Sequence, residues 1–419
     1  MAQNLFVKFN EKEIKHVRID ETNDKYSQPA YSVWYQYPAE KEGEYRFDIW
    51  SGEKHTHALF YCSASVDILL TRRSQFLATK QQYKKEGSAL DGAYLIYDSE
   101  EDALYYSHKA DHNGGRERLA MGIIMAQYLK RHPEDAKCME SLNAYERYVY
   151  RELYDENTGV VYNDINRNND WHRLYNYPWV ANFQIALYRL KKDVRYLLNA
   201  YKTMMGYYRS GGEHFYAIGI EAYELKTLLD EAGFEAQSAF TQAFLNHADQ
   251  LTQTSVNYPT SEVKYEQSIV APAVSCLLQA YQISGEQKYL EEARKQLKLL
   301  ELFNGKQADY HLFENAIRHW DGYWFGKYEC YGDTFPHYWS TLSGDVFASY
   351  AQITGDKSYE HKAKASLRGC LNLFFIDGMA SCAMVYPDTV NGKKAHYYDP
   401  WANDQDWALY YAVKWALDL

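Results

Sequence analysis

The 419-residue chain lacks the features that mark nucleic-acid-binding, membrane-spanning and disulfide-rich proteins. Its 56 acidic residues outnumber 45 basic ones and give a net charge of −11, whereas a nucleic-acid binder needs a basic surface. No apolar run approaches the roughly 18 residues that span a bilayer. The six cysteines are scattered without a CxxC pair, so neither a zinc site nor a disulfide scaffold is expected. We therefore expect neither a nucleic acid nor a membrane among its partners.

The N-terminus also lacks the pattern of a secretory signal. The opening stretch MAQNLFVKFN has no basic region followed by an apolar one, and a signal peptide needs both. We expect a cytoplasmic protein, or a secreted or periplasmic one if a signal peptide has been removed.

Aromatic residues, in contrast, are abundant. The chain holds 10 Trp, 42 Tyr and 17 Phe, which together make up 16% of it. Tyr and Trp combine a flat apolar face with one polar group, so they suit sugar rings as well as protein cores. The composition favours a carbohydrate ligand, although core packing uses the same residues.

Two kinds of pattern divide the chain near residue 65. Residues 1–65 contain short, aromatic-rich and partly alternating segments at 5–9, 30–37 and 45–50, which predict strands. From Val66 onward apolar residues recur every three or four positions, which predicts helices. Twelve helical windows follow: 66–83, 116–130, 136–153, 179–190, 193–208, 216–231, 235–251, 268–283, 286–303, 339–353, 356–374 and 404–417.

Short and long connections alternate between these windows. Short links force neighbouring helices to run antiparallel, so the alternation places every long loop at the same end. The long loops are 84–115, 154–178, 209–215, 252–267, 304–338 and 375–403. An internal repeat supports paired helices, because 282–289 (QISGEQKY) matches 352–359 (QITGDKSY).

Six helical hairpins with one-sided loops favour closure into a ring. We predict a mainly α fold, an (α/α)6 toroid over residues 66–419, with the β-rich segment 1–65 packed on it. An open helical solenoid is the alternative, because stacked repeats also bury a continuous core.

The first three long loops carry polar and aromatic residues beside glycine. Asp111, His112 and Arg116 flank two glycines before a helix; glycine lets a ligand approach the backbone, and Arg116 suits a carboxylate. A helix cap and a local ion pair explain the same residues. The later candidates are His172, Tyr177 and Trp179 in the second loop, and Glu213 and His214 in the third.

The last two long loops hold the densest aromatic clusters. The fifth loop is the densest, and exposing its many large rings would create a sticky patch, so that loop must pack on the ring, bind something, or both. Their candidates are His319, Trp320, Asp321, Trp324, Glu329, Asp333, His337 and Trp339 in one loop, and Asp399 and Trp401 in the other. The spacing of His and acidic residues is too loose for a metal motif, and no phosphate-binding glycine loop is present, so we expect neither metal nor cofactor.

Two stretches, HWDGYWFG…GDTFPHYWS and YDPWANDQDW, together with the Ser/Thr-Gly-acid-x-x-Tyr turns, carry a family resemblance. Over roughly residues 66–419 the chain resembles the six-hairpin glycosidase superfamily. The two aromatic stretches resemble the bacterial β-glucuronidase-like family, glycoside hydrolase family 154. The superfamily also contains unsaturated glucuronyl hydrolases and polysaccharide lyases, so the fold does not determine the reaction.

The resemblance and the loop residues together predict an exo-acting glycoside hydrolase that removes a terminal uronic acid from an oligosaccharide. Asp333, Asp111 and Glu213 are the predicted catalytic carboxylates, because glycosidic cleavage needs one acid and a second carboxylate. Arg116 is expected to bind the sugar carboxylate, and the other loop residues named above the sugar. The net charge of −11 favours a short substrate over a long polyanion.

Two alternatives stay open. The first is a polysaccharide lyase that cleaves next to a uronate by β-elimination, with His172, Tyr177, His319 and Tyr328 as candidate bases and acids. The second is a glycan-binding protein without catalysis. The sequence predicts no particular oligomeric state.

Overall fold

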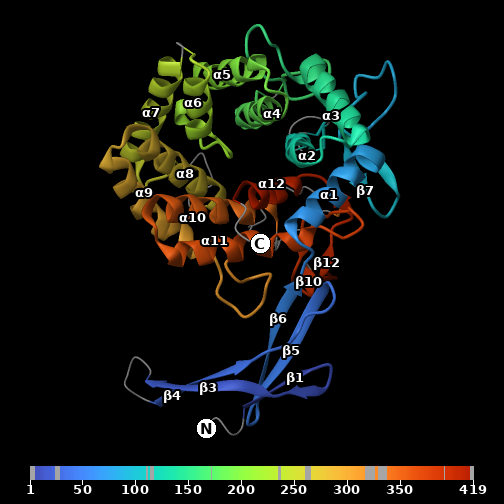
Figure 1. Ribbon diagram of the computed structural model, residues 1–419, viewed down its shortest axis with the longest axis vertical. Helices are drawn as coiled ribbons and strands as arrows, with labels where there is room; N and C mark the ends of the chain where they lie inside the picture. The colour runs from blue at the N-terminus through green and yellow to red at the C-terminus, as the bar shows by residue number, and fades with distance from the viewer. Residues whose placement is uncertain are drawn as a thin grey trace.

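The computed structural model describes residues 5–23, 29–109, 112–113, 118–170, 172–234, 237–259, 266–316, 326–328, 337–390 and 392–415. Over these ranges the helices form a double ring, and a long β arm extends from it at the N-terminal end (Figure 1). The predicted (α/α)6 toroid is confirmed. No helix within the described ranges is long and apolar enough to cross a membrane.

Six helices form the inner ring and six the outer ring. The inner helices are α2 (Leu119–Arg131), α4 (Asn176–Lys191), α6 (Ala222–Glu231), α8 (Gln267–Ser284), α10 (Thr341–Thr354) and α12 (Asp406–Trp415). The outer helices are α1 (Val66–Phe76), α3 (Ala136–Tyr148), α5 (Val194–Arg209), α7 (Gln237–Thr254), α9 (Gln287–Leu300) and α11 (Lys357–Gly369). Short π turns, Leu77–Gln81 and Val149–Leu153, extend α1 and α3.

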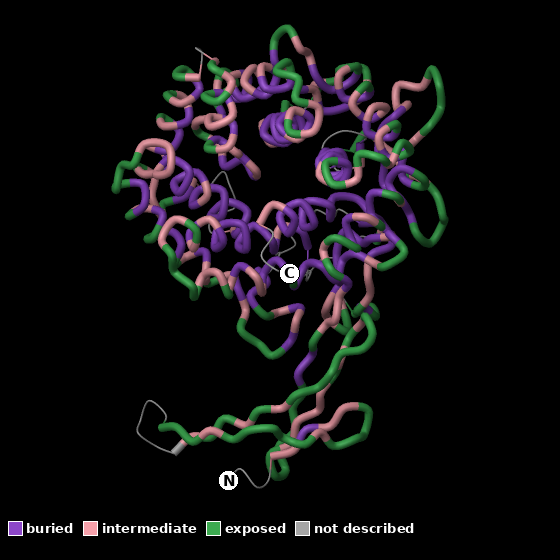
Figure 2. The backbone as a smooth tube through the Cα atoms, viewed as in Figure 1, coloured by how far each residue is buried: buried purple, intermediate pink, exposed green. Residues whose placement is uncertain are grey.

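The inner and outer helices differ in how their residues are buried (Figure 2). In α8 every residue from Gln267 to Val274 is buried, as expected for a helix enclosed by neighbours. In α9 burial follows one stripe, Tyr289, Leu290, Ala293, Leu297 and Leu300. The outer helices therefore cover the inner ring with one face and meet solvent with the other.

Tight turns join α4, α8 and α10 to the outer helices that follow them. α8 ends at Gly285 and α10 at Gly355, with φ of 73° and 75°; glycine adopts this left-handed conformation without a steric penalty. The acidic residue after Gly355, Asp356, accepts a hydrogen bond from the Ser358 amide and begins α11. These are the turns that the internal repeat predicts.

The ring closes between the first and last helices. Arg73 of α1 and Asp406 of α12 are separated by 333 residues in the chain and form a two-pronged ion pair, with both N–O distances 2.8 Å. Each side chain is 1% exposed. Closure distinguishes this fold from the open solenoid.

One predicted helix begins later than expected. The window 216–231 predicts helix from residue 216, but α6 starts at Ala222. Gly219 has a φ of 79°, and its carbonyl accepts a hydrogen bond from the Asn182 amide at 2.8 Å. A left-handed residue tied to a neighbouring helix prevents an earlier start.

The N-terminal segment is an arm of antiparallel strands. β1 (Leu5–Phe9), β2 (Lys12–Ile14), β5 (Gly43–Ser51) and β6 (Lys54–Cys62) form a sheet in the order β2-β1-β5-β6, while β3 (His16–Asn23) pairs with β4 (Pro29–Tyr35). The sequence predicts a segment packed on the toroid. Among the described residues the arm meets the ring at Leu59, whose amide and carbonyl bond to Ala308 and Tyr310, and at Glu44 and Tyr61, which also contact Tyr310. The rest of the arm projects outward (Figure 1).

Short strands connect the long loops near the ring. β13 (Trp401–Ala402), β7 (Ile96–Asp98) and β8 (Ala103–Tyr105) form one sheet in that order. β9 (Met384–Val385) pairs with β12 (Tyr397–Tyr398), and β10 (Thr389–Val390) with β11 (Lys393–Lys394). The three-stranded sheet joins the first long loop to the last one.

Candidate functional site

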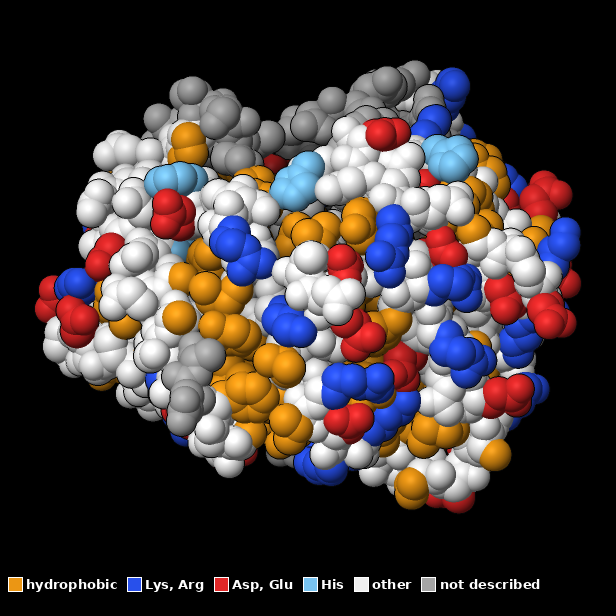
Figure 3. Space-filling view, turned by 90° about the horizontal axis from the view of Figure 1, so that it is seen from above, with side chains coloured by type: hydrophobic (Ala, Val, Ile, Leu, Met, Phe, Trp, Pro, Cys, Tyr) orange, Lys and Arg blue, Asp and Glu red, His pale blue; other side chains and the backbone are white. Residues whose placement is uncertain are grey.

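A long loop precedes each inner helix in the chain, and α6 is the one that begins deeper in the ring, where the Tyr223 amide and the Ile220 carbonyl bond to Gln279 of α8. The short turns at residues 192–193, 285–286 and 355–356 lie at the end of the ring opposite the long loops. The one-sided arrangement predicted from loop lengths therefore holds, and it gathers the candidate residues at one end. Exposed histidine side chains lie near one edge of the face in Figure 3.

Trp401 and His112, from the last and first loops, come together at this end. The Trp401 ring stacks on Tyr105 at 4.6 Å and meets His112 edge-on at 5.0 Å. Its indole N–H donates to the Asp98 carboxylate at 3.0 Å. Trp401 is 6% exposed and Tyr105 is 38% exposed, so Tyr105 offers the open aromatic face and Trp401 supports it.

Asp399 and Lys327 hold a short piece of the fifth loop against the first and last loops. The Asp399 carboxylate accepts hydrogen bonds from the backbone amides of Lys327, at 2.9 Å, and Tyr328, at 3.3 Å. The Lys327 ammonium lies 2.8 Å from Asp98 and 2.9 Å from Glu100. Burial alone would raise the pKa of Asp98, but hydrogen bonds from Lys327 and Trp401 outweigh it and lower that pKa. In this arrangement Asp399 anchors a loop.

A buried polar floor lies at the N-terminal ends of α2, α10 and α12. His337 Nε2 is 3.2 Å from an Asp404 carboxylate oxygen, and the Trp339 amide donates to His337 Nδ1 at 3.2 Å. Arg118 donates to the Asn403 side-chain oxygen. His337 is 1% exposed, and Arg118 and Asp404 are fully buried. The arrangement fixes the two predicted binding residues His337 and Trp339 relative to α12.

Tyr106, His108 and Asp164 form a hydrogen-bonded group between the first and second loops. The Tyr106 hydroxyl lies 3.0 Å from both Asp164 oxygens, and His108 Nδ1 lies 2.9 Å from one of them. The Asp164 side chain is 7% exposed, whereas that of His108 is 78% exposed. Burial, and then the Asp164 carboxylate, raise the pKa of Tyr106. With Nδ1–H engaged by a carboxylate, His108 presents Nε2 as a proton acceptor.

None of these three residues was selected from the sequence. A signal exists, because Tyr97-Asp98…Tyr105 and Tyr154-Asp155…Tyr162 are similar segments that each follow an outer helix. Tyr106 and Asp164 come just after the two matching tyrosines. Tyr106 and Asp164 thus follow similar segments in the first and second long loops, and in the folded ring they are hydrogen-bonded to each other.

A second tyrosine–histidine pair lies at the start of α4. The Tyr177 hydroxyl is 3.4 Å from His172 Nε2, so these two candidates for elimination chemistry are neighbours. Tyr177 is 1% exposed, and burial raises its pKa. Trp179, two residues further along α4, is 1% exposed and packs against Trp407 at 5.4 Å. Trp179 therefore lies in the ring core.

Comparisons with known proteins identify the fold. No protein-family model and no curated protein matches the chain. A solved structure described as a polysaccharide lyase is 39% identical over 99% of the chain, with a TM-score of 0.91, and the chain spans 61% of that protein's length. A family 76 glycoside hydrolase from a bovine Bacteroides thetaiotaomicron strain is 11% identical, with a TM-score of 0.52, over 99% of this chain and 97% of that one.

An unsaturated glucuronyl hydrolase mutant from Streptococcus agalactiae is 10% identical, with a TM-score of 0.51, over 84% of this chain and 90% of that one. The chain has the six-hairpin glycosidase fold. Family 154 is not among the names of these three structures, and that closer resemblance stays a prediction.

Of the remaining candidates, the structure describes Glu213 and His214. In the six-hairpin ring Glu213 and His214 lie in a short 3₁₀ turn (Gly212–His214) before α6. Their side chains are 3.3 Å apart and 44% and 65% exposed. The other predicted residues lie outside the described residues: Asp111, Arg116, His319, Trp320, Asp321, Trp324, Glu329 and Asp333. In the part of the chain that the structure describes, no three metal-binding side chains cluster.

Proposed function

We propose that the chain is a carbohydrate-active enzyme that cleaves a uronate-containing glycan by β-elimination. The Tyr106–His108–Asp164 group carries the proposal, because it joins a proton donor and a proton acceptor on one buried carboxylate. The 39% identical protein described as a polysaccharide lyase supports the same reaction class.

β-Elimination breaks the C5–H and C4–O4 bonds of the uronate and forms a C4–C5 double bond. In the proposal His108 Nε2 accepts the C5 proton, and the Tyr106 hydroxyl donates a proton to the departing O4. Asp164 orients both groups and stabilises the imidazolium, as a carboxylate does for a catalytic histidine. The raised pKa of Tyr106 keeps its proton in place at neutral pH.

Two further groups have proposed roles in positioning the substrate. The exposed ring of Tyr105, supported by Trp401, offers a flat surface for one sugar face. Arg116 keeps its predicted role of binding the sugar carboxylate, because a guanidinium pairs with a carboxylate through two parallel hydrogen bonds. A neutralised carboxylate makes the C5 proton more acidic, which elimination requires.

Ultraviolet absorbance of the unsaturated product tests the proposal. The substrates are uronate-containing polysaccharides and oligosaccharides. We expect His108→Ala and Tyr106→Phe each to reduce kcat by about 10²- to 10⁴-fold, the usual contribution of a general acid or base. Asp164→Asn should reduce kcat and shift its pH profile. The matched control is Tyr223→Phe on α6, an exposed tyrosine away from the loops. Near-normal turnover of both His108→Ala and Tyr106→Phe would remove these assignments.

The second candidate is the exo-acting hydrolase with Asp333, Asp111 and Glu213 as its carboxylates. The exposed position of Glu213 beside His214 favours it, because the carboxylate is accessible to a ligand. Its product is a saturated uronic acid without new absorbance, so one assay separates the two reactions. Loss of activity in Asp333→Asn and Asp111→Asn, with Tyr106→Phe unaffected, would favour the hydrolase. Binding without any product would favour a glycan-binding protein.

A further inference from the structure

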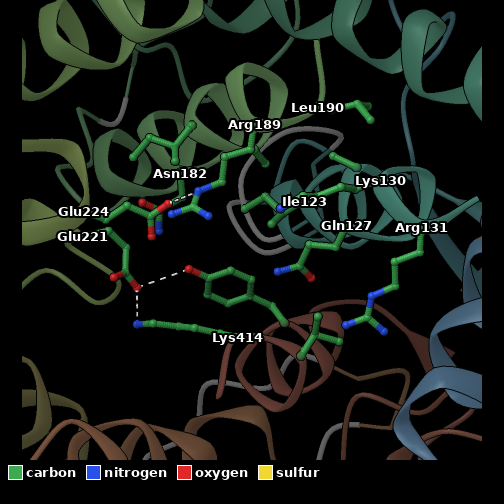
Figure 4. Close-up of a pocket in the computed structure, with 15 residues that line it drawn as sticks. Ile123, Gln127, Lys130, Arg131, Asn182, Arg189, Leu190, Glu221, Glu224 and Lys414 are labelled. Atoms are coloured by element: carbon green, nitrogen blue, oxygen red, sulfur yellow. Dashed lines mark hydrogen bonds and ion pairs between the residues drawn. The ribbon is translucent and has the colours of Figure 1, made fainter. Parts of the chain in front are cut away.

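A cavity of about 400 Å³ lies inside the ring, at the end opposite the long loops (Figure 4). It is lined by α2 from Ile123 onward, by the second half of α4, by the second half of α12, and by the start of α6. α2 is 13 residues long, so its two ends are about 20 Å apart. The mouth at Lys130 therefore lies about 16 Å along α2 from Leu119, and the cavity opens on the face of the ring opposite the candidate site.

The floor of the cavity is a satisfied network of charges. Glu221 accepts hydrogen bonds from the Lys414 ammonium at 2.6 Å and from the Tyr410 hydroxyl at 3.2 Å. Lys414 also lies 2.9 Å from Asp345, which accepts the Trp415 indole N–H at 2.8 Å. Burial raises the pKa of Glu221, against the opposing effect of Lys414. The Glu221 carboxyl keeps further hydrogen-bonding capacity, since each carboxyl oxygen has two acceptor sites.

The walls combine apolar surface with one unsatisfied acceptor. Ile123, Ile185 and Val413 give an apolar lining. The side-chain oxygen of Gln127 is buried, and no described residue donates a hydrogen bond to it. Figure 4 shows Glu221 and Lys414 meeting at one side of the lining and Gln127 extending from α2 on the other side. A buried acceptor of this kind is stabilised by a hydroxyl or amine donor.

The mouth of the cavity is cationic. Arg131 pairs with Asp67, and Arg189 pairs with Glu224 at 2.6 Å. Lys130 is exposed at the rim, and no described residue forms an ion pair with it. In a protein with a net charge of −11, an unpaired cation at a cavity mouth favours an anionic group on the ligand.

We propose that this cavity binds a small hydroxylated carboxylate of the size of one sugar ring, such as a free uronic acid. The carboxylate of the ligand contacts Lys130 at the mouth, away from the carboxyl groups of Glu221 and Asp345 on the floor, which would repel it. The ligand's hydroxyls reach Gln127 and Glu221, and its C–H face covers Ile123 and Ile185. The volume lies within the range of about 300–1,000 Å³ that is usual for small-molecule sites. The binding does not depend on the reaction proposed for the opposite end.

Calorimetric titration of the full chain with D-glucuronate tests this inference, with D-glucose as the comparison that lacks a carboxylate. We expect glucuronate to bind at least tenfold more tightly than glucose. Lys130→Gln should weaken glucuronate binding about tenfold, and Gln127→Leu should weaken it severalfold. The control is Lys137→Gln, an exposed lysine on α3, which should bind as the parent does. Circular dichroism and melting curves verify that each variant is folded.

Three results would overturn the inference. Equal affinity for glucose and glucuronate would show that the carboxylate is not recognised. Unchanged affinity in both Lys130→Gln and Gln127→Leu would place any binding elsewhere. Glucuronate bound only at the candidate active site would lose affinity in His108→Ala and keep it in Lys130→Gln.

Discussion

The ion pair between Arg73 and Asp406 closes the ring, and its loss should destabilise the whole fold. Replacing Asp406 by Asn leaves the Arg73 guanidinium in a site that is 1% exposed, without a counter-charge. Its remaining partners are the Gln81 side-chain oxygen at 2.7 Å and the Gly378 carbonyl at 3.2 Å. Both are neutral, so the charge is not compensated.

The size of the effect follows from burial. Breaking a buried pair by removing one partner costs about 3–5 kcal/mol. The entropy of unfolding is about 2.1 cal/mol/K per residue, which gives about 0.9 kcal/mol/K for 419 residues. Asp406→Asn should therefore lower the melting temperature by roughly 3–6 °C. Because Asp404, two residues earlier, contacts His337, turnover should fall as well.

Urea unfolding and calorimetry measure this effect, with two matched variants. Asp67→Asn removes the exposed pair that α1 makes with Arg131, whose side chains are 78% and 42% exposed, and should cost less than about 1 kcal/mol. The double variant Arg73→Met/Asp406→Leu removes both charges and should recover most of the stability. A loss below about 1 kcal/mol in Asp406→Asn, or a double variant no better than the single one, would refute the reasoning.

Three further predictions concern other parts of the ring. Burial lowers the pKa of His247 on α7 to about 4, below its unfolded value near 6.5. The stability that this neutral histidine contributes is therefore present above pH 6.5 and is lost as the pH falls toward 4. Between about pH 7 and pH 5 the free energy of unfolding of the parent, measured in urea, should fall by roughly 2 kcal/mol, and that of His247→Gln should fall much less. Lys327→Met removes the cation between Asp98 and Glu100 and should reduce kcat/KM for the glycan severalfold, whereas Lys306→Met, an exposed lysine, should not; equal activity would contradict the anchoring role. Gly122→Ala would place a Cβ 2.6 Å from the Tyr145 ring and 2.7 Å from the Phe183 ring, and should cost about 1–3 kcal/mol in unfolding free energy; a variant as stable as the parent would contradict this close packing.

The helical hairpins and their one-sided loops were predictable because their signals are local. Apolar spacing along a helix and a Gly-acid turn such as 285–286 need no information from the rest of the chain. The start of α6 was missed for the opposite reason. Gly219 takes its conformation beside Asn182, which belongs to another helix.

The sequence predicted which loops contain the candidate site, but it predicted only some of the side chains in it. Loop composition marked His112 and Trp401, which the structure brings into contact. Asp164 could not be paired with Tyr106 from the sequence, since the two are 58 residues apart and meet only when the ring forms. Residue type alone could not place Trp179, because a tryptophan at the start of a helix packs into a protein core as readily as it lines a sugar site.

The common direction of the inner helices has an electrostatic consequence. The N-terminal ends of five inner helices, α2, α4, α8, α10 and α12, lie toward the long loops. Each helix end carries roughly half a positive elementary charge from its aligned peptide dipoles. The backbone therefore creates a positive field at the loop end of a molecule whose side chains sum to −11. An anionic ligand that approaches this end would meet an attraction that a count of lysines and arginines does not reveal.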